Sequence, residues 1–229
     1  MKMKILMPIL FCLLSFPFML SAQSADVLLQ KVSVTLSAGQ EEQAVSLFSQ
    51  AINANPDKSE MYYWTQVDKN SPVCVKLAQK LALYYKKSRN YDKAYLFYRE
   101  LLQKDPNDVT FLAGYAETEV SRGREDDALE AYEKILQLDA NNLAANIFIG
   151  NYLYLKAEQE KKQLDTDFKK LNAPTRMQYA RYKDGLSRVL SNGYGKAKEY
   201  LQNVIQQFPS TEAQKTLNKI KLIEIEVNR

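Results

Sequence analysis

The sequence contains no histidine, one tryptophan and two cysteines among its 229 residues. Histidine is the commonest catalytic base and a common zinc ligand, so its absence removes the usual Ser or Cys triads and the usual zinc sites. A glycine-rich phosphate loop, a CxxC pair and an acidic calcium loop are also missing. We therefore expect a protein without enzymatic activity, cofactor or metal.

Glycine and proline are scarce at seven residues each, and no low-complexity tract is present, so the composition is that of a folded chain. The formal net charge is only +4, and the two signs are interspersed. Lys2 and Lys4 contribute two of these charges. A balance of this kind provides no basic face for nucleic acid.

A long apolar run occurs only at the N-terminus. Lys2 and Lys4 precede the run Ile5–Leu20, and Ser21-Ala22-Gln23 follows it. A helix of that length spans about 24 Å, which is less than the ~30 Å hydrocarbon core of a bilayer. Residues 1–22 therefore predict a secretory signal peptide, with a retained membrane anchor as the alternative. No later stretch is apolar enough to predict a membrane span.

Export would place the protein in the periplasm of a Gram-negative cell, and it would remove Cys12 with the signal peptide. Cys74 would then be the only thiol of the mature chain, so no intramolecular disulfide is expected. A buried, unreactive cysteine is favoured over a reactive thiol because no histidine is available as its base.

One pattern recurs four times: a small Ala, a large apolar residue four positions later, and a turn eight positions after that. The pairs are Ala44–Phe48, Ala94–Tyr98, Ala128–Tyr132 and Ala197–Leu201. A second amphipathic run precedes each one. Gly39, Gly123 and Gly193 lie near the turns between the paired runs, where a positive backbone angle is needed. Each unit therefore predicts a helix, a tight turn, a second helix and a stop.

The numbering advances by 34 from Ala94 to Ala128, by 69 from Ala128 to Ala197 and by 50 from Ala44 to Ala94. A helix–turn–helix with a period of about 34 residues, and with Ala, an aromatic residue and Pro at these offsets, resembles the tetratricopeptide repeat. The resemblance implies an all-α, right-handed α-solenoid over residues 23–229. Its units are 25–58, 75–108, 109–142, a degenerate 143–177 and 178–211, with a capping helix at 210–227.

Two segments depart from the pattern towards the C-terminus. Residues 143–171 carry no proline and predict one long helix, with two helices and an unmarked turn as the alternative. The capping helix is expected to begin at Ser210 or Thr211. Its predicted buried residues are Leu217, Ile220 and Leu222.

The residues between the first two units are a third departure. Ser59 is expected to cap a short helix that runs through Val67. Trp64 lies in this helix. It is either an exposed anchor for a partner or a side chain packed against the neighbouring helices.

The resemblance implies a concave groove lined by the first helix of each pair. The groove residues expected on that basis are Gln79, Leu83, Lys86, Ala113, Glu117, Ile147, Asn151 and Tyr154. The resemblance also places Asn151 where its amide would clamp the backbone of a bound peptide, since an amide both donates and accepts hydrogen bonds. The alternative is an Asn151 that is bonded internally between helices.

Two functions are compatible with these features. The first is a non-catalytic, exported scaffold that binds a peptide segment or a helix of another protein in its groove. The second is a structural subunit of an envelope assembly, or a homo-oligomer, joined through the long helix and the C-terminal helix. The sequence leaves the partner protein and the oligomeric state open.

Overall fold

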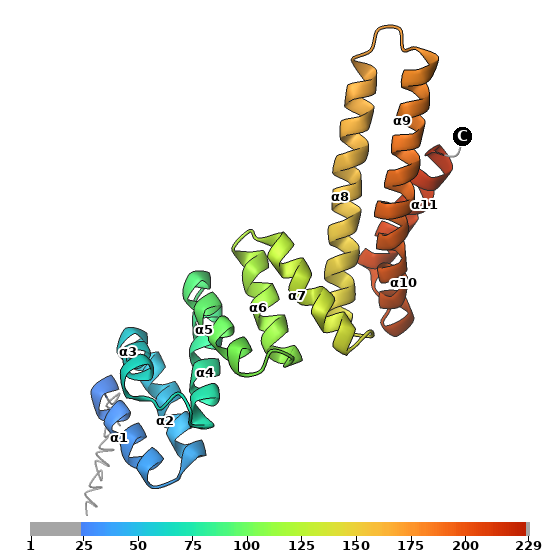
Figure 1. Ribbon diagram of the computed structural model, residues 1–229. Coiled ribbons are helices and arrows are strands. Elements are labelled where there is room, and N and C mark those ends of the chain that lie inside the picture. Colours follow the sequence, from blue (N-terminus) through green and yellow to red (C-terminus); the bar gives the residue numbers. More distant parts are fainter. Residues whose placement is uncertain (1–23, 228–229) are drawn as a thin grey trace, which may run out of the picture. The chain divides into compact units, whose positions relative to one another are not determined.

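A computed structural model describes residues 24–227 (Figure 1). These residues form eleven α-helices and one π-helix, and no β-strand occurs among them. The predicted all-α architecture is confirmed. The signal peptide predicted at residues 1–22 lies outside the described residues. The chain divides into two compact units, the first ending at Tyr62 and the second beginning at Tyr63, and each is considered by itself.

The first unit contains the helix pair α1 (Ala25–Ser37) and α2 (Glu41–Ala54). Ser24 caps α1 through a hydrogen bond from the backbone N–H of Val27. Gly39 has a φ of +74° in the turn between the helices, as the sequence predicts. Ala44 and Phe48 are completely buried, so the predicted small and large contact residues both lie in the core.

Helix α3 (Pro56–Gln66) begins in the first unit and ends in the second. Its start differs from the prediction that Ser59 caps it. Asn55 is the capping residue, because its side-chain oxygen accepts from the backbone N–H of Lys58 at 3.0 Å. Proline fits the first turn of a helix, where its missing N–H is not needed. Ser59 lies inside the helix, and its hydroxyl donates to the carbonyl of Asn55.

The second unit starts with two regular helix pairs. Their helices are α4 (Val73–Lys87) with α5 (Tyr91–Lys104), and α6 (Val109–Ser121) with α7 (Glu125–Leu138). Asn90 caps α5 and Asp108 caps α6. Helix α5 also packs against α6, and α7 packs against the next helix, so the pairs stack in sequence order.

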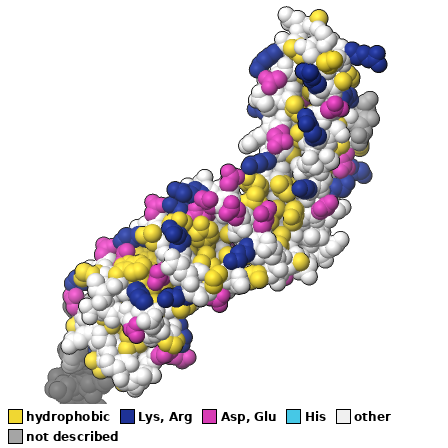
Figure 2. Space-filling model, in the orientation of Figure 1, with side chains coloured by type: hydrophobic (Ala, Val, Ile, Leu, Met, Phe, Trp, Pro, Cys, Tyr) yellow, Lys and Arg dark blue, Asp and Glu magenta, His cyan; other side chains and the backbone are white. Residues whose placement is uncertain are grey.

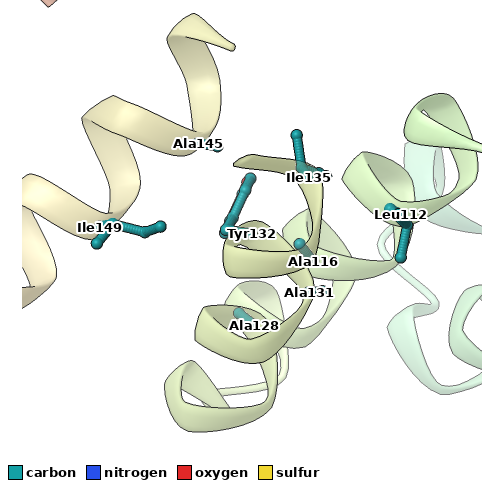
Figure 3. Packing of buried hydrophobic residues seen from close by; sticks show 8 residues of the cluster. All are labelled: Leu112, Ala116, Ala128, Ala131, Tyr132, Ile135, Ala145 and Ile149. Atoms are coloured by element: carbon teal, nitrogen blue, oxygen red, sulfur yellow. The ribbon is translucent and has the colours of Figure 1, made fainter. Parts of the chain in front are cut away.

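The buried cluster between α6, α7 and the following helix α8 (Leu143–Lys169) shows how the pattern of small and large residues produces this stacking (Figure 3). Ala128, Ala131, Tyr132 and Ile135 of α7 lie between α6 and α8. The small side chain of Ala128, which is completely buried, lets the helices approach each other. Tyr132 is 5% exposed and fills the space one turn further on.

Helix α8 (Leu143–Lys169) is a single helix of 27 residues, which decides between the two predictions for this segment. A short loop joins it to α9 (Arg176–Val189), and α8 and α9 run side by side in opposite directions (Figure 1). The π-helix η1 (Leu190–Gly195) then leads directly into α10 (Lys196–Gln207). We call the part of this hairpin formed by residues 158–192 the arm.

The predicted turn at Gly193 is therefore wrong, and so is the helix–turn–helix predicted for residues 178–211. Gly193 lies within η1 and is not among the residues with positive φ. Glycine is needed at position 193 for a different reason. A Cβ added there would lie 2.6 Å from the Cβ of Ala157. The glycine allows α8 and η1 to approach closely at the base of the arm.

Helix α8 pairs with α10 rather than forming a repeat of its own. Ala82, Ala116 and Gly150 follow one another at the repeat period, each on the first helix of its pair. A Cβ on Gly150 would lie 2.9 Å from Cγ of Leu201, so α8 approaches α10 at this position. Residues 143–207 are thus one helix pair in which the arm replaces the short turn.

Helix α11 (Thr211–Val227) packs against α10 and begins with Ser210 as its cap. Ile220 is completely buried and Leu217 packs against the same cluster, as predicted. Leu222 is 67% exposed, so the prediction that it is buried is wrong. Ala213 and Ile223 lie on the packed side of α11 instead. Within residues 24–227, no helix combines the length and the apolar character needed to cross a bilayer.

Candidate functional site

The predicted groove residues lie on α4, α6 and α8, the first helices of three successive pairs. They fall into rows whose members are one repeat period apart, which places equivalent positions of the three helices on the same side of the second unit. One row contains Gln79, Ala113 and Ile147, and another contains Leu83, Glu117 and Asn151.

A third row contains Lys86, Val120 and Tyr154, and its middle member was missed in the sequence. Val120 is 36% exposed, and the same repeat period that connects Lys86 with Tyr154 would have found it. We call the surface formed by these nine positions the first-helix face.

Two of the predicted residues are exposed apolar side chains. Leu83 is 46% exposed and Ile147 is 38% exposed, whereas Leu81 and Ile149, two residues away on the same helices, are buried. Helices α4 and α8 thus bury one side in the helix stack and leave large aliphatic side chains on the other. With Val120 of α6, all three first helices present apolar contact area for another molecule.

An ion pair connects two of the helices on this face. The Lys86 ammonium group donates a hydrogen bond to the Glu117 carboxylate, which links α4 to α6. Burial is the largest single influence and disfavours the charged form of Lys86, but the hydrogen bond and charge of Glu117, together with contributions from Tyr98, outweigh it and raise the pKa of Lys86. The Glu117 side chain remains 51% exposed.

The two asparagines of α8 differ in their hydrogen bonds. Asn146 is completely buried, and its amide nitrogen donates to the carbonyls of Ala140 and Asn142 at 3.1 and 2.9 Å. Asn151 is half-buried, and no hydrogen bond connects its amide to another described residue. The internal hydrogen bonds that were considered for Asn151 are thus formed by Asn146 instead. The amide of Asn151 is available to a ligand.

Ala113 and Tyr154 are less accessible than the prediction requires. Ala113 packs against the cluster between α6, α7 and α8. The Tyr154 ring packs edge-on against buried Tyr194, with the ring centroids 5.9 Å apart. Both residues belong to the first-helix face, but they also support the helix stack.

Trp64 is packed against a neighbouring helix and also partly exposed. Its ring stacks on Phe97 of α5 at 5.4 Å between centroids, and it remains 43% exposed. The completely buried aromatic residue of this segment is Tyr63, whose hydroxyl lies 3.1 Å from the sulfur of Cys74. Cys74 is buried, as predicted.

Several clefts of the second unit lie away from the first-helix face. One of about 660 Å³ is lined by the α6–α7 turn, by Asp126 at the start of α7 and by Tyr152 and Lys156 of α8. Tyr152 donates a hydrogen bond to Asp126 and, together with Lys156, lowers the pKa of that carboxyl. Asp126 thus has a structural role at this helix start, and no group of His, Cys, Asp and Glu within residues 24–227 has the arrangement of a metal site.

Charged side chains show no preference for one sign on the visible face of the molecule, where Lys and Arg alternate with Asp and Glu (Figure 2). Hydrophobic side chains are exposed between them. This surface suits contacts that combine apolar area with individual ion pairs and hydrogen bonds, as protein–protein interfaces do.

Residues 86–147, which extend from the end of α4 to the start of α8, match the family model of the tetratricopeptide repeat. A solved protein from Bacteroides ovatus ATCC 8483, for which protein binding has been suggested, is 66% identical. The match covers 90% of this chain and 100% of that one, with a TM-score of 0.83. The chain belongs to the tetratricopeptide-repeat family.

Solved tetratricopeptide-repeat proteins are also similar to it at lower identity. One from Parabacteroides merdae ATCC 43184 is 16% identical over 88% of this chain and 74% of that one, with a TM-score of 0.40. YrrB, a tetratricopeptide-repeat protein described as having an unusual peptide-binding site, is 13% identical over 88% of this chain and 93% of that one, with a TM-score of 0.39. No match was found among curated proteins. Membership of this family supports a scaffold for protein–protein interaction.

Proposed function

We propose that this tetratricopeptide-repeat protein is an exported scaffold that binds a peptide segment or a helix of another protein on its first-helix face. The observation that carries the proposal is the repetition of exposed apolar side chains on three successive first helices, Leu83, Val120 and Ile147. A ligand that crosses the helices contacts all three repeats.

Polar groups on the same face supply specificity. Asn151 offers a donor and an acceptor that no described residue uses, and they suit the N–H and C=O groups of a peptide backbone. Glu117 is held in place by Lys86 but retains an exposed carboxylate. Hydrogen bonds of this kind fix the register of a bound chain, while the aliphatic side chains contribute affinity.

Site-specific photo-crosslinking in the native envelope tests the proposal. A photoreactive phenylalanine analogue replaces Leu83 or Ile147 on the first-helix face. The matched controls are Leu96 of α5 and Leu138 of α7, which are similarly exposed at 50% and 47% but belong to second helices. We expect discrete adducts with one protein from the first two positions and none from the controls.

Asn151→Ala is the accompanying binding test. Because the half-buried amide makes no hydrogen bond to another described residue, its loss should leave the fold intact and weaken capture of the crosslinked protein about five- to tenfold. Equal adduct yields from the control positions, or full capture by the Asn151→Ala variant, would contradict binding on this face.

Export is part of the proposal and has its own test. Its support is the sequence of residues 1–22, where lysines, a short apolar run and small residues follow one another. We expect protein recovered from the envelope fraction to begin near Gln23. An intact mass equal to that of the whole chain, in protein from the cytoplasm, would refute export without affecting the first-helix face.

The structural-subunit function is the second candidate, and one observation favours it. Leu222 and Ile225, nearly one turn apart on α11, are 67% and 45% exposed. Sedimentation analysis distinguishes the candidates: a subunit function requires a defined oligomer that Leu222→Glu dissociates. A monomer that still forms crosslinks through Leu83 leaves the scaffold function in place.

A further inference from the structure

The end of the arm has an unusual concentration of positive charge. We call residues 167–181 the arm tip; it comprises the last residues of α8, the connecting loop and the start of α9. Its basic residues are Lys169, Lys170, Arg176 and Arg181, and its only acidic residue is Asp167. The net charge of this short segment is therefore +3, close to that of the whole chain.

Most of this charge is not neutralised within the protein. Lys170 pairs with Asp167 at 2.8 Å. Lys169, Arg176 and Arg181 are exposed, and none of them forms an ion pair with a residue in the described part of the chain. The guanidinium group of Arg181 contacts the sulfur of Met177 at 3.8 Å instead. Lys169 is attracted to Asp165, whose pKa it helps to lower, but all three cations remain available to an anionic partner.

Large apolar side chains are exposed beside these cations. Leu171 is 37%, Met177 66% and Tyr179 50% exposed. Single exposed apolar residues are common on protein surfaces and need no explanation. Three of them within nine residues, next to three unpaired cations, form an amphipathic surface at the end of a hairpin (Figure 1).

The arm tip is ordered by its own contacts. Phe168 stacks on Tyr182 with the ring centroids 4.2 Å apart, and the Tyr182 hydroxyl donates to Asp165 at 2.7 Å. Thr175 and Gln178 form a capping box at the start of α9. Of the three exposed apolar residues only Tyr179 joins these contacts, through an edge-on packing on Phe168 at 6.0 Å between ring centroids. Leu171 and Met177 are therefore not needed to hold the fold together.

We propose that the arm tip docks on an anionic lipid surface. Basic side chains near such a surface are attracted to lipid phosphates, and adjacent apolar side chains enter the boundary between headgroups and acyl chains. A protein partner is a poorer fit, because a stable interface usually buries about 1,200–2,000 Å². A hairpin end with three large apolar side chains offers much less, whereas a bilayer requires no complementary shape.

Vesicle cosedimentation tests this proposal. The protein begins at Ser24, so that the apolar run Ile5–Leu20 does not itself bind lipid and every described helix is retained. The vesicles contain phosphatidylethanolamine with phosphatidylglycerol, or phosphatidylcholine alone. We expect binding to the anionic vesicles, weaker binding in about 0.5 M salt, where charges are screened, and little binding to the neutral vesicles.

Two triple variants separate the contributions of charge and apolar contact. Each basic residue near an anionic surface strengthens binding about fivefold, so Lys169→Gln with Arg176→Gln and Arg181→Gln should weaken it about a hundredfold. Leu171→Ser with Met177→Ser and Tyr179→Ser should also release the protein. All six side chains are exposed, so circular dichroism should show unchanged helical content.

The matched control neutralises three exposed lysines of the regular helix pairs, Lys80, Lys87 and Lys104, and should bind vesicles as the unmodified protein does. Equal losses in the control and the tip variant would reduce the effect to overall charge and overturn the proposal. Tip-dependent binding to soluble polyglutamate without vesicle binding would overturn it in favour of an acidic protein. Crosslinking through Leu83 is independent of these results, so the function proposed for the first-helix face is judged separately.

Discussion

The helix pairs α6–α7 and α8–α10 pack through the same kind of side-chain contact, but the chain segments that connect their two helices differ. In the first, three residues (122–124) turn the chain, and Gly123 supplies the positive φ. In the second, α8 continues beyond its partner, and the chain returns through α9 and η1 before α10 begins. In both pairs a small residue of the first helix and a large residue of the second helix are packed together: Ala116 and Tyr132 lie in one buried cluster, and Gly150 lies against Leu201.

The comparison shows that side-chain packing at the contact, and not the connection, decides which helices pair. The entropy cost of closing a loop rises only slowly with its length, so an insertion in a turn is tolerated when the ends still meet. The arm adds packing of its own along its length, between Leu164 and the region of Gly185, which keeps it straight and helical. We therefore expect the stack and the arm to be energetically separate.

The largest expected effect is in the stack. Tyr98 is 3% exposed, and its replacement by Ala should lower the free energy of unfolding by roughly 3–5 kcal/mol. Tyr182 of the arm is only half-buried, so Tyr182→Ala, with loss of its bond to Asp165, should lower it by about 1–2 kcal/mol. Chemical denaturation measures both values.

Hydrogen exchange then shows where each variant opens. Repeats transmit a loss of stability mainly to their neighbours, so Tyr98→Ala should expose amides of α4 to α7 first. Tyr182→Ala should expose amides of α9 and the second half of α8 only. Simultaneous loss of protection in α5 and α9 by either variant would show that the stack and the arm unfold as one.

Glycines at close helix contacts offer a second comparison of the stack with the arm, with a smaller expected effect on stability. A Cβ on Gly114 of α6 would lie 2.2 Å from the Tyr98 ring, and one on Gly193 would lie 2.6 Å from Cβ of Ala157. Either Gly→Ala change should cost roughly 1–3 kcal/mol, because a packed neighbour must move. Thermal unfolding checks the values, and crosslinking through Leu83 should persist in Gly193→Ala, since that clash lies at the base of the arm.

The sequence predicted the regular pairs well because their contacts recur at the repeat period. It failed in the last pair for a definable reason. The arm lengthens the connection by nearly one period, so the distance from Ala128 to Ala197 was consistent with an additional repeat. Gly150, in phase with Ala82 and Ala116, marked the true first helix, but a glycine inside a helix is weak evidence by itself.

The predicted first-helix face was only partly accessible, for a similar reason. Periodicity identified the exposed positions Leu83 and Ile147 and would also have found Val120. It gave no information on Tyr154, because the buried Tyr194 that covers it belongs to η1, whose place depends on the arm. Contacts between residues far apart in sequence determine such positions, and a single-sequence pattern does not contain them.

Shortening the arm should have a small effect on the stack. Residues 165–184 are replaced by a short Gly/Asn turn that connects Leu164 to Gly185, which already lie against each other. The remaining helices should lose about 1–2 kcal/mol of stability, no more than Tyr182→Ala, since the lost contacts are the half-buried stack of Phe168 on Tyr182 and ion pairs that contribute little. Denaturation monitored by circular dichroism tests this. Loss of cooperative unfolding would show that α8 and α10 depend on the arm to pair.

The smallest expected effect is a gain in stability at the turn between α4 and α5. Arg89 has a φ of +60° at the position where Gly39 and Gly123 each have +74°. A side chain in this left-handed conformation costs roughly 1–2 kcal/mol, whereas glycine adopts it freely. Arg89 is exposed and forms no ion pair with a described residue, so Arg89→Gly removes no such contact.

Because glycine also increases the entropy of the unfolded chain, the net gain from Arg89→Gly should be about 0.5–1 kcal/mol. The matched control is Gly123→Ala. No atom lies within 4 Å of the added Cβ there, so any loss of stability comes from the backbone alone. Denaturant midpoints should shift in opposite directions for the two variants, with an unchanged slope. A midpoint that falls in Arg89→Gly would show that the arginine side chain stabilises this turn more than its backbone strain costs.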